Sequence, residues 1–260
     1  METRRFTAVL GLVFLTGVPA CHSGDSQGAK TPAEVQEERV KAAERIDDAA
    51  TVLAEIGGTS DDTRKIPGAI TQRAECVAVV PGLVEGAFIV GAKSGRGVAS
   101  CRTPGGWSAP GFFRLSGGTL GAQIGGRSTD VLMLLNSQRA KRSFLSGDFR
   151  VGGEVSATAG AVGSGRGVDS TSTSLRAEVV SYTRGRGLFA GADLSGAEVR
   201  TDVAANDAYH GKSKELAVIL SQSPAPSAEV NRFLEEVASL FVRSGPEVVP
   251  GEPAQANATP

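Results

Sequence analysis

The spacing of hydrophobic residues changes along this chain. Between residues 33 and 56 they recur every three or four positions, which predicts an amphipathic helix beginning after Thr31-Pro32 and ending at Gly57-Gly58. From Cys76 onwards the period falls to two, which is typical of β-strands. Residues 227–242 return to helical spacing. We therefore expect a β-rich domain with a long helix at each end.

Eight segments carry the strand pattern, with turn residues such as Pro81-Gly82 and Ser94-Gly95-Arg96-Gly97 between them. The predicted strands cover residues 76–80, 86–92, 97–102, 112–125, 130–136, 149–159, 175–183 and 188–200. Short helices are predicted at residues 62–75, 137–145, 202–209 and 213–220. This order predicts an α+β fold, in which a strongly curled antiparallel sheet or a small barrel removes exposed sheet edges.

A glycine-rich stretch follows the single tryptophan of the chain, Trp107. Gly117, Gly121 and Gly125 are spaced by four, so within one strand they would all lie on the same face. A face without side chains lets a bulky side chain, another chain segment or a ligand approach the backbone. We expect a bare glycine-rich face here, and we expect Trp107 to pack in the core or under a loop.

The first twenty residues have the composition of an export signal. Arg4 and Arg5 precede an apolar segment, residues 6–18, that is too short to span a bilayer comfortably as a helix. Cys21 follows Val18-Pro19-Ala20, as at a bacterial lipobox, and would become the lipidated first residue of the mature chain. Cleavage after Ala20 by ordinary signal peptidase is the alternative, and both predict export.

These features divide the chain into a signal peptide (1–20), a tether (21–32), a domain (33–243) and a disordered tail rich in Pro, Gly and Ala (244–260). His22 stands where an Asp would favour retention in the inner membrane. We therefore expect a lipid-anchored protein of the outer membrane that faces the periplasm.

Charge is segregated along the chain. Residues 63–220 hold 19 basic and 12 acidic residues, a net charge of +7, whereas residues 21–62 and 221–260 carry −6 and −3. A basic domain attracts anionic surfaces such as lipid headgroups. Solvated arginines scattered for solubility would produce the same totals. Export makes nucleic acid an unsuitable partner.

The composition offers little for catalysis or metal binding, because the whole chain holds two His and three Cys. We predict no catalytic residues, no metal site and no cofactor, and a structural role for His210. Cys76 and Cys101 remain if Cys21 is acylated. They either form a disulfide, which an oxidising compartment favours, or stay as buried thiols, since the two predicted strands that hold them are not consecutive.

The ordered set of motifs between residues 60 and 221 resembles the SYLF domain family. The matching pieces are Ile66-Pro67, Val77–Pro81, Gly86–Gly91, Gly95–Val98, Gly106–Pro110, Gly117–Gly125, Ser181-Tyr182, Gly187–Gly191, Asn206 and Tyr209-His210-Gly211. The helix at 33–56 also lies where the family often has an N-terminal helix.

The resemblance implies a lipid-binding module without enzymatic activity. Eukaryotic members bind phosphoinositides and in some cases actin, but an exported bacterial protein would meet envelope phospholipids or a partner protein instead. From charge we select Lys93, Arg96, Arg139, Lys141 and Arg142 as headgroup contacts. The competing hypothesis is a periplasmic scaffold that binds another envelope protein through the glycine-rich face. An enzyme acting on lipid or cell wall is disfavoured, because no nucleophile and base stand out.

Overall fold

A computed structural model describes residues 30–57, 66–87, 90–120, 125–151, 157–161, 177–185, 194, 196–211 and 215–243. The chain divides into two units, Met1–Thr31 and Pro32–Pro260, and only the second is described at length. The predicted signal peptide, Cys21, most of the tether and the tail lie outside the described residues. They remain predictions.

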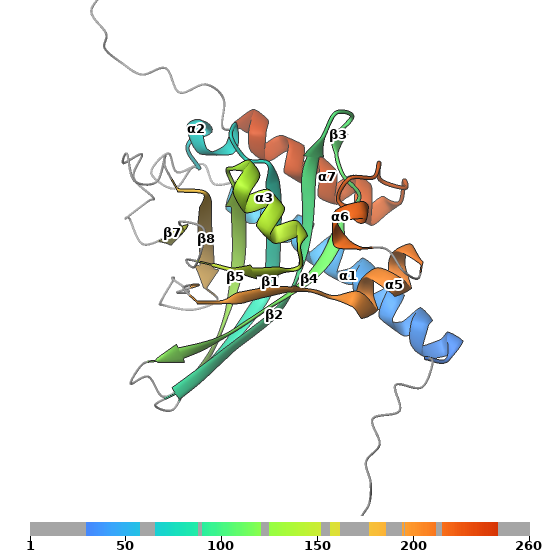
Figure 1. Cartoon of the computed structure of the whole chain (residues 1–260), viewed down its shortest axis with the longest axis horizontal. Coiled ribbons are helices and arrows are strands. Elements are labelled where there is room, and N and C mark those ends of the chain that lie inside the picture. Colours follow the sequence, from blue (N-terminus) through green and yellow to red (C-terminus); the bar gives the residue numbers. More distant parts are fainter. Residues whose placement is uncertain are drawn as a thin grey trace, which may run out of the picture. The chain divides into compact units, whose positions relative to one another are not determined.

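The described strands form one strongly curled, mainly antiparallel sheet (Figure 1). Its order is β6-β9-β4-β2-β1-β5-β8-β7, and β3 pairs with β2 off this path. The strands are β1 (Cys76–Ala87), β2 (Val90–Thr103), β3 (Gly106–Trp107), β4 (Gly111–Leu120), β5 (Gly125–Leu135), β6 (Asp148–Arg150), β7 (Ala157–Ala161), β8 (Val179–Gly185) and β9 (Glu198–Thr201). β6 and β7 end the described sheet, so it forms an open half-barrel. The predicted α+β class with a curled antiparallel sheet is confirmed.

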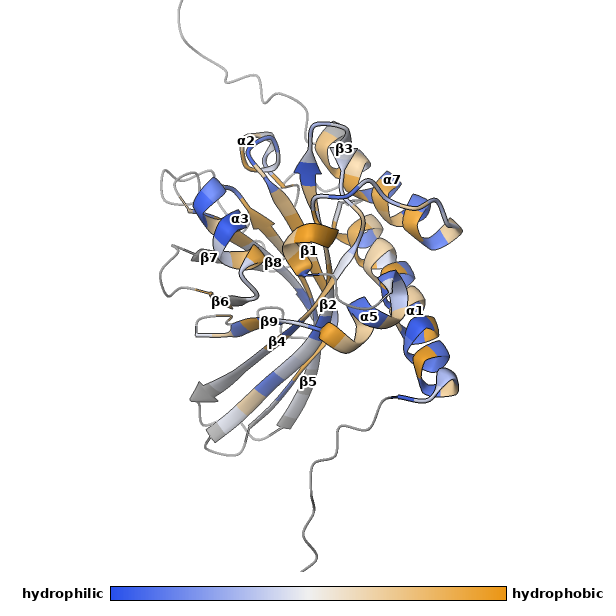
Figure 2. Ribbon diagram, turned by 45° about the vertical axis from the view of Figure 1, so that its right-hand side comes forward, coloured by the Kyte–Doolittle hydropathy of each residue, from blue (hydrophilic) through white to orange (hydrophobic). Residues whose placement is uncertain are grey.

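Helices cover both faces of this sheet. They are α1 (Pro32–Gly57), α2 (Gly68–Thr71), α3 (Gln138–Leu145), α5 (Val203–His210), α6 (Leu216–Ile219) and α7 (Ala228–Arg243). One hydrophobic core lies between the sheet and α1, α2, α5 and α7, and a second lies between the opposite face of the sheet and α3 and α6. Hydrophobic and hydrophilic residues alternate along α1 in Figure 2. Among the described helices, none combines the length and apolarity needed to cross a membrane.

The long helix α1 matches the segment predicted at 33–56 almost to the residue. Its buried stripe contains small alanines beside larger residues, which lets the helix axis approach the sheet and α7. Its acidic side forms ion pairs with Arg96 on β2, Arg184 on β8 and Arg232 on α7. The acidic helix therefore packs on the basic domain, and part of the domain's positive charge is neutralised internally.

The predicted turn at residues 94–97 is wrong, because β2 runs through it without interruption. Likewise β1 continues past Pro81-Gly82, where the pairing shifts by a bulge. The glycines of β2 serve close packing. A Cβ atom placed on Gly95 would lie 2.5 Å from Val80, and one on Gly97 would lie 2.2 Å from the ring of Phe113.

We expect Gly97→Ala to lower the free energy of unfolding by about 1–3 kcal/mol, because the added Cβ would overlap the fully buried ring of Phe113 and force the ring or the strand to shift. Urea unfolding followed by circular dichroism would measure this change. Gly118→Ala is the matched control: it lies on an exposed stretch of β4, and the nearest atom to its Cβ would be 3.9 Å away. Equal stability of the two variants would contradict this account of β2.

The predicted bare strip of Gly117, Gly121 and Gly125 is also wrong. Gly117 belongs to β4 and Gly125 to β5, and Gly121 lies outside the described residues. The position of Gly117 is filled from both sides, since a Cβ there would lie 3.1 Å from both Lys93 and Ala197. A bare face does exist on the same side of the sheet as α1, formed by the exposed residues Gly86, Ala92, Gly118 and Gly126.

The segment predicted as one antiparallel strand over 149–159 is divided between the two ends of the sheet. β6 pairs antiparallel with β9, whereas β7 pairs parallel with β8. The predicted helix at 62–75 shortens to α2 within the described residues. The helices predicted at 137–145, 202–209, 213–220 and 227–242 are confirmed as α3, α5, α6 and α7.

Candidate functional site

Asp202 is the centre of an ion-pair cluster that joins α1, β2, β4 and α5. The residue is fully buried at the start of α5, where its side chain forms no capping hydrogen bond. Instead Oδ2 accepts from Arg45 Nη1 at 3.2 Å and Oδ1 accepts from Arg114 Nη2 at 3.0 Å. Arg96 Nε lies 3.9 Å from Oδ2, and Arg96 Nη1 also donates to Glu38 at 3.1 Å.

Arg45 is the buried cation of this cluster. Its side chain is 9% exposed, and its guanidinium lies 5.4 Å from the centre of the Phe112 ring. Burial lowers the pKa of Arg45, while the charge of Asp202 acts in the opposite direction. Because a buried charge without a partner is costly, Asp202 and Arg45 depend on each other.

Arginines occupy one row of residues across three neighbouring strands. In the strand register, Arg96 on β2 lies opposite Arg114 on β4, and Arg114 lies opposite Arg200 on β9. Their side chains are 44%, 48% and 63% exposed. In the next row Glu198 accepts hydrogen bonds from Arg150 and Arg200, and these bonds lower the pKa of Glu198. The cluster therefore presents guanidinium groups on the same side of the sheet as α1.

The three basic residues predicted on α3 lie on the opposite side of the sheet. The helix buries Ala140 and Phe144 in the second core, and Arg139 and Arg142 are exposed. Lys141 Nζ donates to the carbonyl oxygen of Arg102 at 2.9 Å and lies 3.6 Å from Glu75 Oε2. Lys141 therefore connects α3 to the strands beneath it.

Lys93 has a position unlike the exposed one that we expected. It is 2% exposed, on the side of β2 that faces away from α1, and its stem lies over Gly117. The residue directly opposite on β1 is Glu85, which is 5% exposed. The five basic residues selected from the sequence are therefore divided between two surfaces and the interior.

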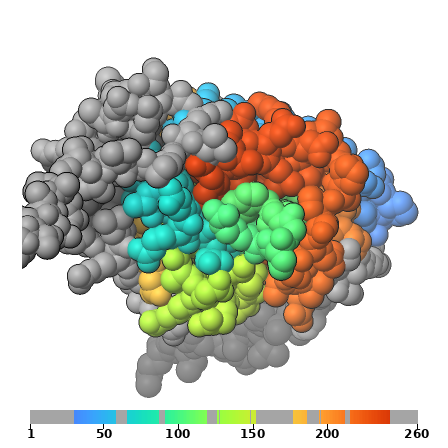
Figure 3. All heavy atoms as spheres, turned by 90° about the horizontal axis from the view of Figure 1, so that it is seen from above, coloured from blue at the N-terminus to red at the C-terminus, as the bar shows by residue number. Residues whose placement is uncertain are grey.

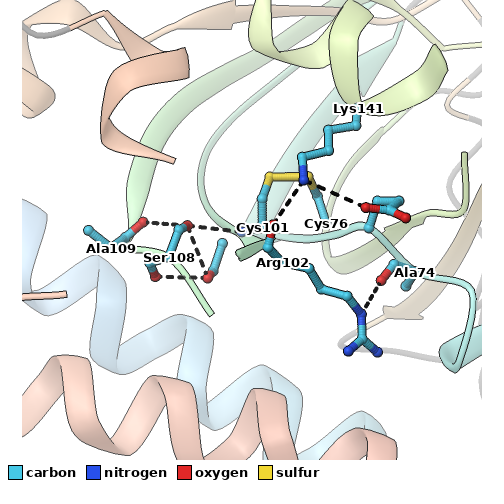
Figure 4. The surroundings of a disulfide bond; sticks show 9 residues. Ala74, Cys76, Cys101, Arg102, Ser108, Ala109 and Lys141 are labelled. Atoms are coloured by element: carbon cyan, nitrogen blue, oxygen red, sulfur yellow. Dashed lines mark hydrogen bonds and ion pairs between the residues drawn. A yellow bond between two sulfur atoms is a disulfide. The ribbon is translucent and has the colours of Figure 1, made fainter. Parts of the chain in front are cut away.

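A disulfide joins Cys76 on β1 to Cys101 on β2, which are opposite one another in the register. The two strands are neighbours because Val90–Thr103 forms a single strand, β2, that pairs antiparallel with β1. Both cysteines are fully buried, and Lys141 lies beside the bond (Figure 4). The hydroxyl of the neighbouring Ser108 accepts from the backbone N–H of Cys101 at 3.0 Å.

Trp107 packs on the core, as predicted. Its ring centre lies 4.9 Å from that of Phe241 on α7. The guanidinium of Arg102 lies 5.0 Å from the centre of the Trp107 ring and 4.6 Å from the centre of the Phe241 ring. Arg102 Nε donates to the carbonyl oxygen of Ala74 at 2.8 Å. Figure 3 shows that α2, β3, α3 and α7 form a continuous surface around this point.

Two polar residues of the family motifs, Asn206 and His210, have structural roles. Asn206 on α5 accepts from the backbone N–H of Phe112 at 2.9 Å and donates to its carbonyl oxygen at 2.8 Å. His210 Nε2 lies 2.7 Å from the carbonyl oxygen of Pro110. Both side chains attach α5 to β4. No group of three or more His, Cys, Asp or Glu suited to a metal ion occurs among the described residues.

Our reading of the sequence missed Asp202, Arg45, Arg114 and Arg200. The chain separates these residues widely, and among them only Arg114 and Arg200 belong to the basic excess of residues 63–220. Asp202 falls within the helix predicted at 202–209, and nothing in the sequence indicated that its carboxylate would form ion pairs with arginines of α1 and β4.

Comparison with known proteins gives consistent matches. Residues 116–240 match the Ysc84 family model, described as "Las17-binding protein actin regulator". Protein YSC84 of Saccharomyces cerevisiae is 34% identical over 184 residues, 68% of this chain and 39% of the relative. LAS seventeen-binding protein 3 of the same species is 32% identical over 67% of this chain and 38% of the relative. SH3 domain-containing YSC84-like protein 1 of Xenopus laevis is 31% identical over 70% of this chain and 53% of the relative.

The chain thus spans about two fifths to one half of the length of these relatives. No solved structure matches it.

Proposed function

Because this chain belongs to the Ysc84 family, the SYLF family indicated by its motifs, we propose that it is a non-enzymatic module that binds anionic lipid headgroups. Its relatives are named as binding and regulatory proteins, and this chain covers part of their length. The observation that carries the proposal is the set of exposed arginines on rigid elements: Arg96, Arg114 and Arg200 on the sheet, and Arg139 and Arg142 on α3. Guanidinium groups suit phosphate oxygens.

We place this module in a bacterial envelope lipoprotein of the outer membrane, facing the periplasm and anchored through Cys21. One acyl chain alone gives marginal membrane binding, whereas a chain combined with a basic surface gives a stable attachment. The anchor and the arginines would supply these two contributions. Actin and nucleic acid are not partners under this proposal.

Vesicle flotation of the Cys21→Ser variant tests lipid binding without the anchor. We expect it to float with vesicles containing phosphatidylglycerol and to remain in solution with pure phosphatidylcholine. Binding should fall several-fold when the salt concentration rises from about 0.05 M to 0.5 M, because salt screens exposed charges. Binding that ignores both lipid charge and salt would contradict the proposal.

The second candidate function is a scaffold that binds another envelope protein. It is supported by the exposed glycine-rich face of Gly86, Ala92, Gly118 and Gly126, and by relatives named for binding a protein. If the Cys21→Ser chain binds no vesicle of either composition, this function replaces lipid binding. A charge introduced by Gly118→Asp should then weaken the protein complex, while Ser146→Asp on the far side of the sheet should not.

A further inference from the structure

We propose that the arginine row on β2, β4 and β9, together with two serines beside it, is the site that binds the phosphate of a lipid headgroup. This inference rests on the proposed lipid-binding function. It assigns headgroup binding to this surface of the sheet and not to the basic residues of α3. The site consists of Arg96, Arg114, Arg200, Ser94 and Ser116.

These residues form a compact block because of the strand register. Ser94 is directly opposite Ser116, and both lie two residues from the arginines along their own strands. Side chains two residues apart on a strand share a face, so hydroxyl and guanidinium donors point in the same direction. Both serines are exposed, and the adjoining Ala92 and Gly118 leave the approach open to a bulky ligand.

Asp202 and Glu38 orient the guanidinium groups of Arg96 and Arg114 but do not occupy all of their N–H donors. Each guanidinium carries more N–H donors than a carboxylate has acceptor sites. Asp202 and Glu38 together face Arg45, Arg96 and Arg114, so donors remain for an incoming anion. Glu198 binds Arg150 and Arg200 in the same way.

Two apolar residues favour a lipid over a soluble phosphate. Among the described residues four large hydrophobic side chains are exposed, and two of them adjoin the block. Val84, 58% exposed, is opposite Ser94, and Val203, 61% exposed, follows Asp202. Apolar side chains beside a phosphate site would contact the acyl boundary of a bilayer.

The start of α1 places this block within reach of the anchor. Glu38 binds Arg96 and lies six residues after Pro32, a distance of about 9 Å along the helix. Pro32 is the eleventh residue after Cys21, and a chain of that length spans at most about 40 Å. The acylated cysteine and the arginine block can therefore engage the same bilayer.

Two double variants with equal charge changes test the assignment in the Cys21→Ser chain. Arg114→Gln/Arg200→Gln removes two arginines of the block, and Arg139→Gln/Arg142→Gln removes two from α3. Affinity for phosphatidylglycerol vesicles and for sn-glycerol 3-phosphate is measured for each. We expect the first variant to lose about tenfold or more in both, since each arginine at an anionic surface adds to binding. The second should stay within about twofold.

Because Arg114 binds the buried Asp202, the first variant could also lose stability. Ser94→Asp, which leaves the ion pairs intact, is therefore measured alongside it, with Ser146→Asp at the residue after α3 as its control. We expect Ser94→Asp to abolish binding while the unfolding transition stays in place. Unchanged binding by Ser94→Asp, or a larger loss from the α3 pair, overturns the site.

The outcomes separate the site from the function. If vesicles bind but only the α3 double variant weakens that binding, the lipid-binding function is supported and the assigned site is wrong. If sn-glycerol 3-phosphate binds at the block but vesicles do not, the phosphate site stands and the membrane role falls. If neither ligand binds, both fall.

Discussion

Replacing Asp202 by Asn is expected to lower the free energy of unfolding by about 3–5 kcal/mol, the usual cost of removing one partner from a buried ion pair. Because the amide has the same shape as the carboxylate, the loss of unfolding free energy measures the effect of removing the charge of Asp202. Arg45, which is 8% exposed, would then lie beside the Phe112 ring without the carboxylate that faces it. Urea unfolding followed by circular dichroism measures the change.

Two further variants show whether the loss comes from the buried arginine. Asp47→Asn breaks the exposed pair with Arg232 on α7 and should leave the unfolding transition almost unchanged, because exposed pairs contribute little. Arg45→Met combined with Asp202→Asn should recover part of the stability, since no uncompensated charge then remains in that position. An Asp202→Asn variant as stable as Asp47→Asn would show that the cluster does not hold α1 to the sheet.

The double variant Cys76→Ala/Cys101→Ala is expected to lose about 2–4 kcal/mol of unfolding free energy, because the crosslink restricts the unfolded chain. In the folded protein both cysteines are fully buried, so a mild reductant should leave the bond intact until the chain unfolds. Thermal or urea unfolding of the variant, compared with the Cys21→Ser chain, gives the magnitude.

Counting thiols in the unfolded protein provides the check. After denaturation without reductant, the Cys21→Ser chain should show no reactive thiol, and with reductant it should show two. Two thiols in the absence of reductant would mean that Cys76 and Cys101 are not bonded in the isolated protein. The stability prediction would then have no basis.

The helices were predictable because their signal is local. In α1 the residues that face the sheet recur every three or four positions, and in α7 Val230, Phe233, Val237 and Leu240 do the same. Each pattern specifies both the helix and its buried side, and the ends follow from neighbouring residues such as Pro32 and Gly57. Most strands were also recognised, since alternation on a sheet is a local property.

The strand ends were harder to predict because glycine has two uses. Ser94-Gly95-Arg96-Gly97 has the composition of a turn, yet β2 passes straight through it. The reason lies in residues distant in the sequence: Val80 on β1 and Phe113 on β4 occupy the space above these glycines. The local sequence pattern of residues 94–97 carries no information about these distant neighbours. The same limitation left the Cys76–Cys101 disulfide undecided, because the two cysteines were predicted on strands that are not consecutive, whereas β1 and β2 are neighbours.

By itself the sequence determined the family motifs, the helices at both ends, the two-residue alternation of the strands and the excess of arginine in the central region. Only the tertiary structure decided which arginines share a surface, that Lys93 is buried, and that Asp202 holds Arg45, Arg96 and Arg114 together. Periodicity is set by a residue and its near neighbours along the chain. The meeting of four charges from α1, β2, β4 and the start of α5 depends on strand register and on the position of α1 against the sheet.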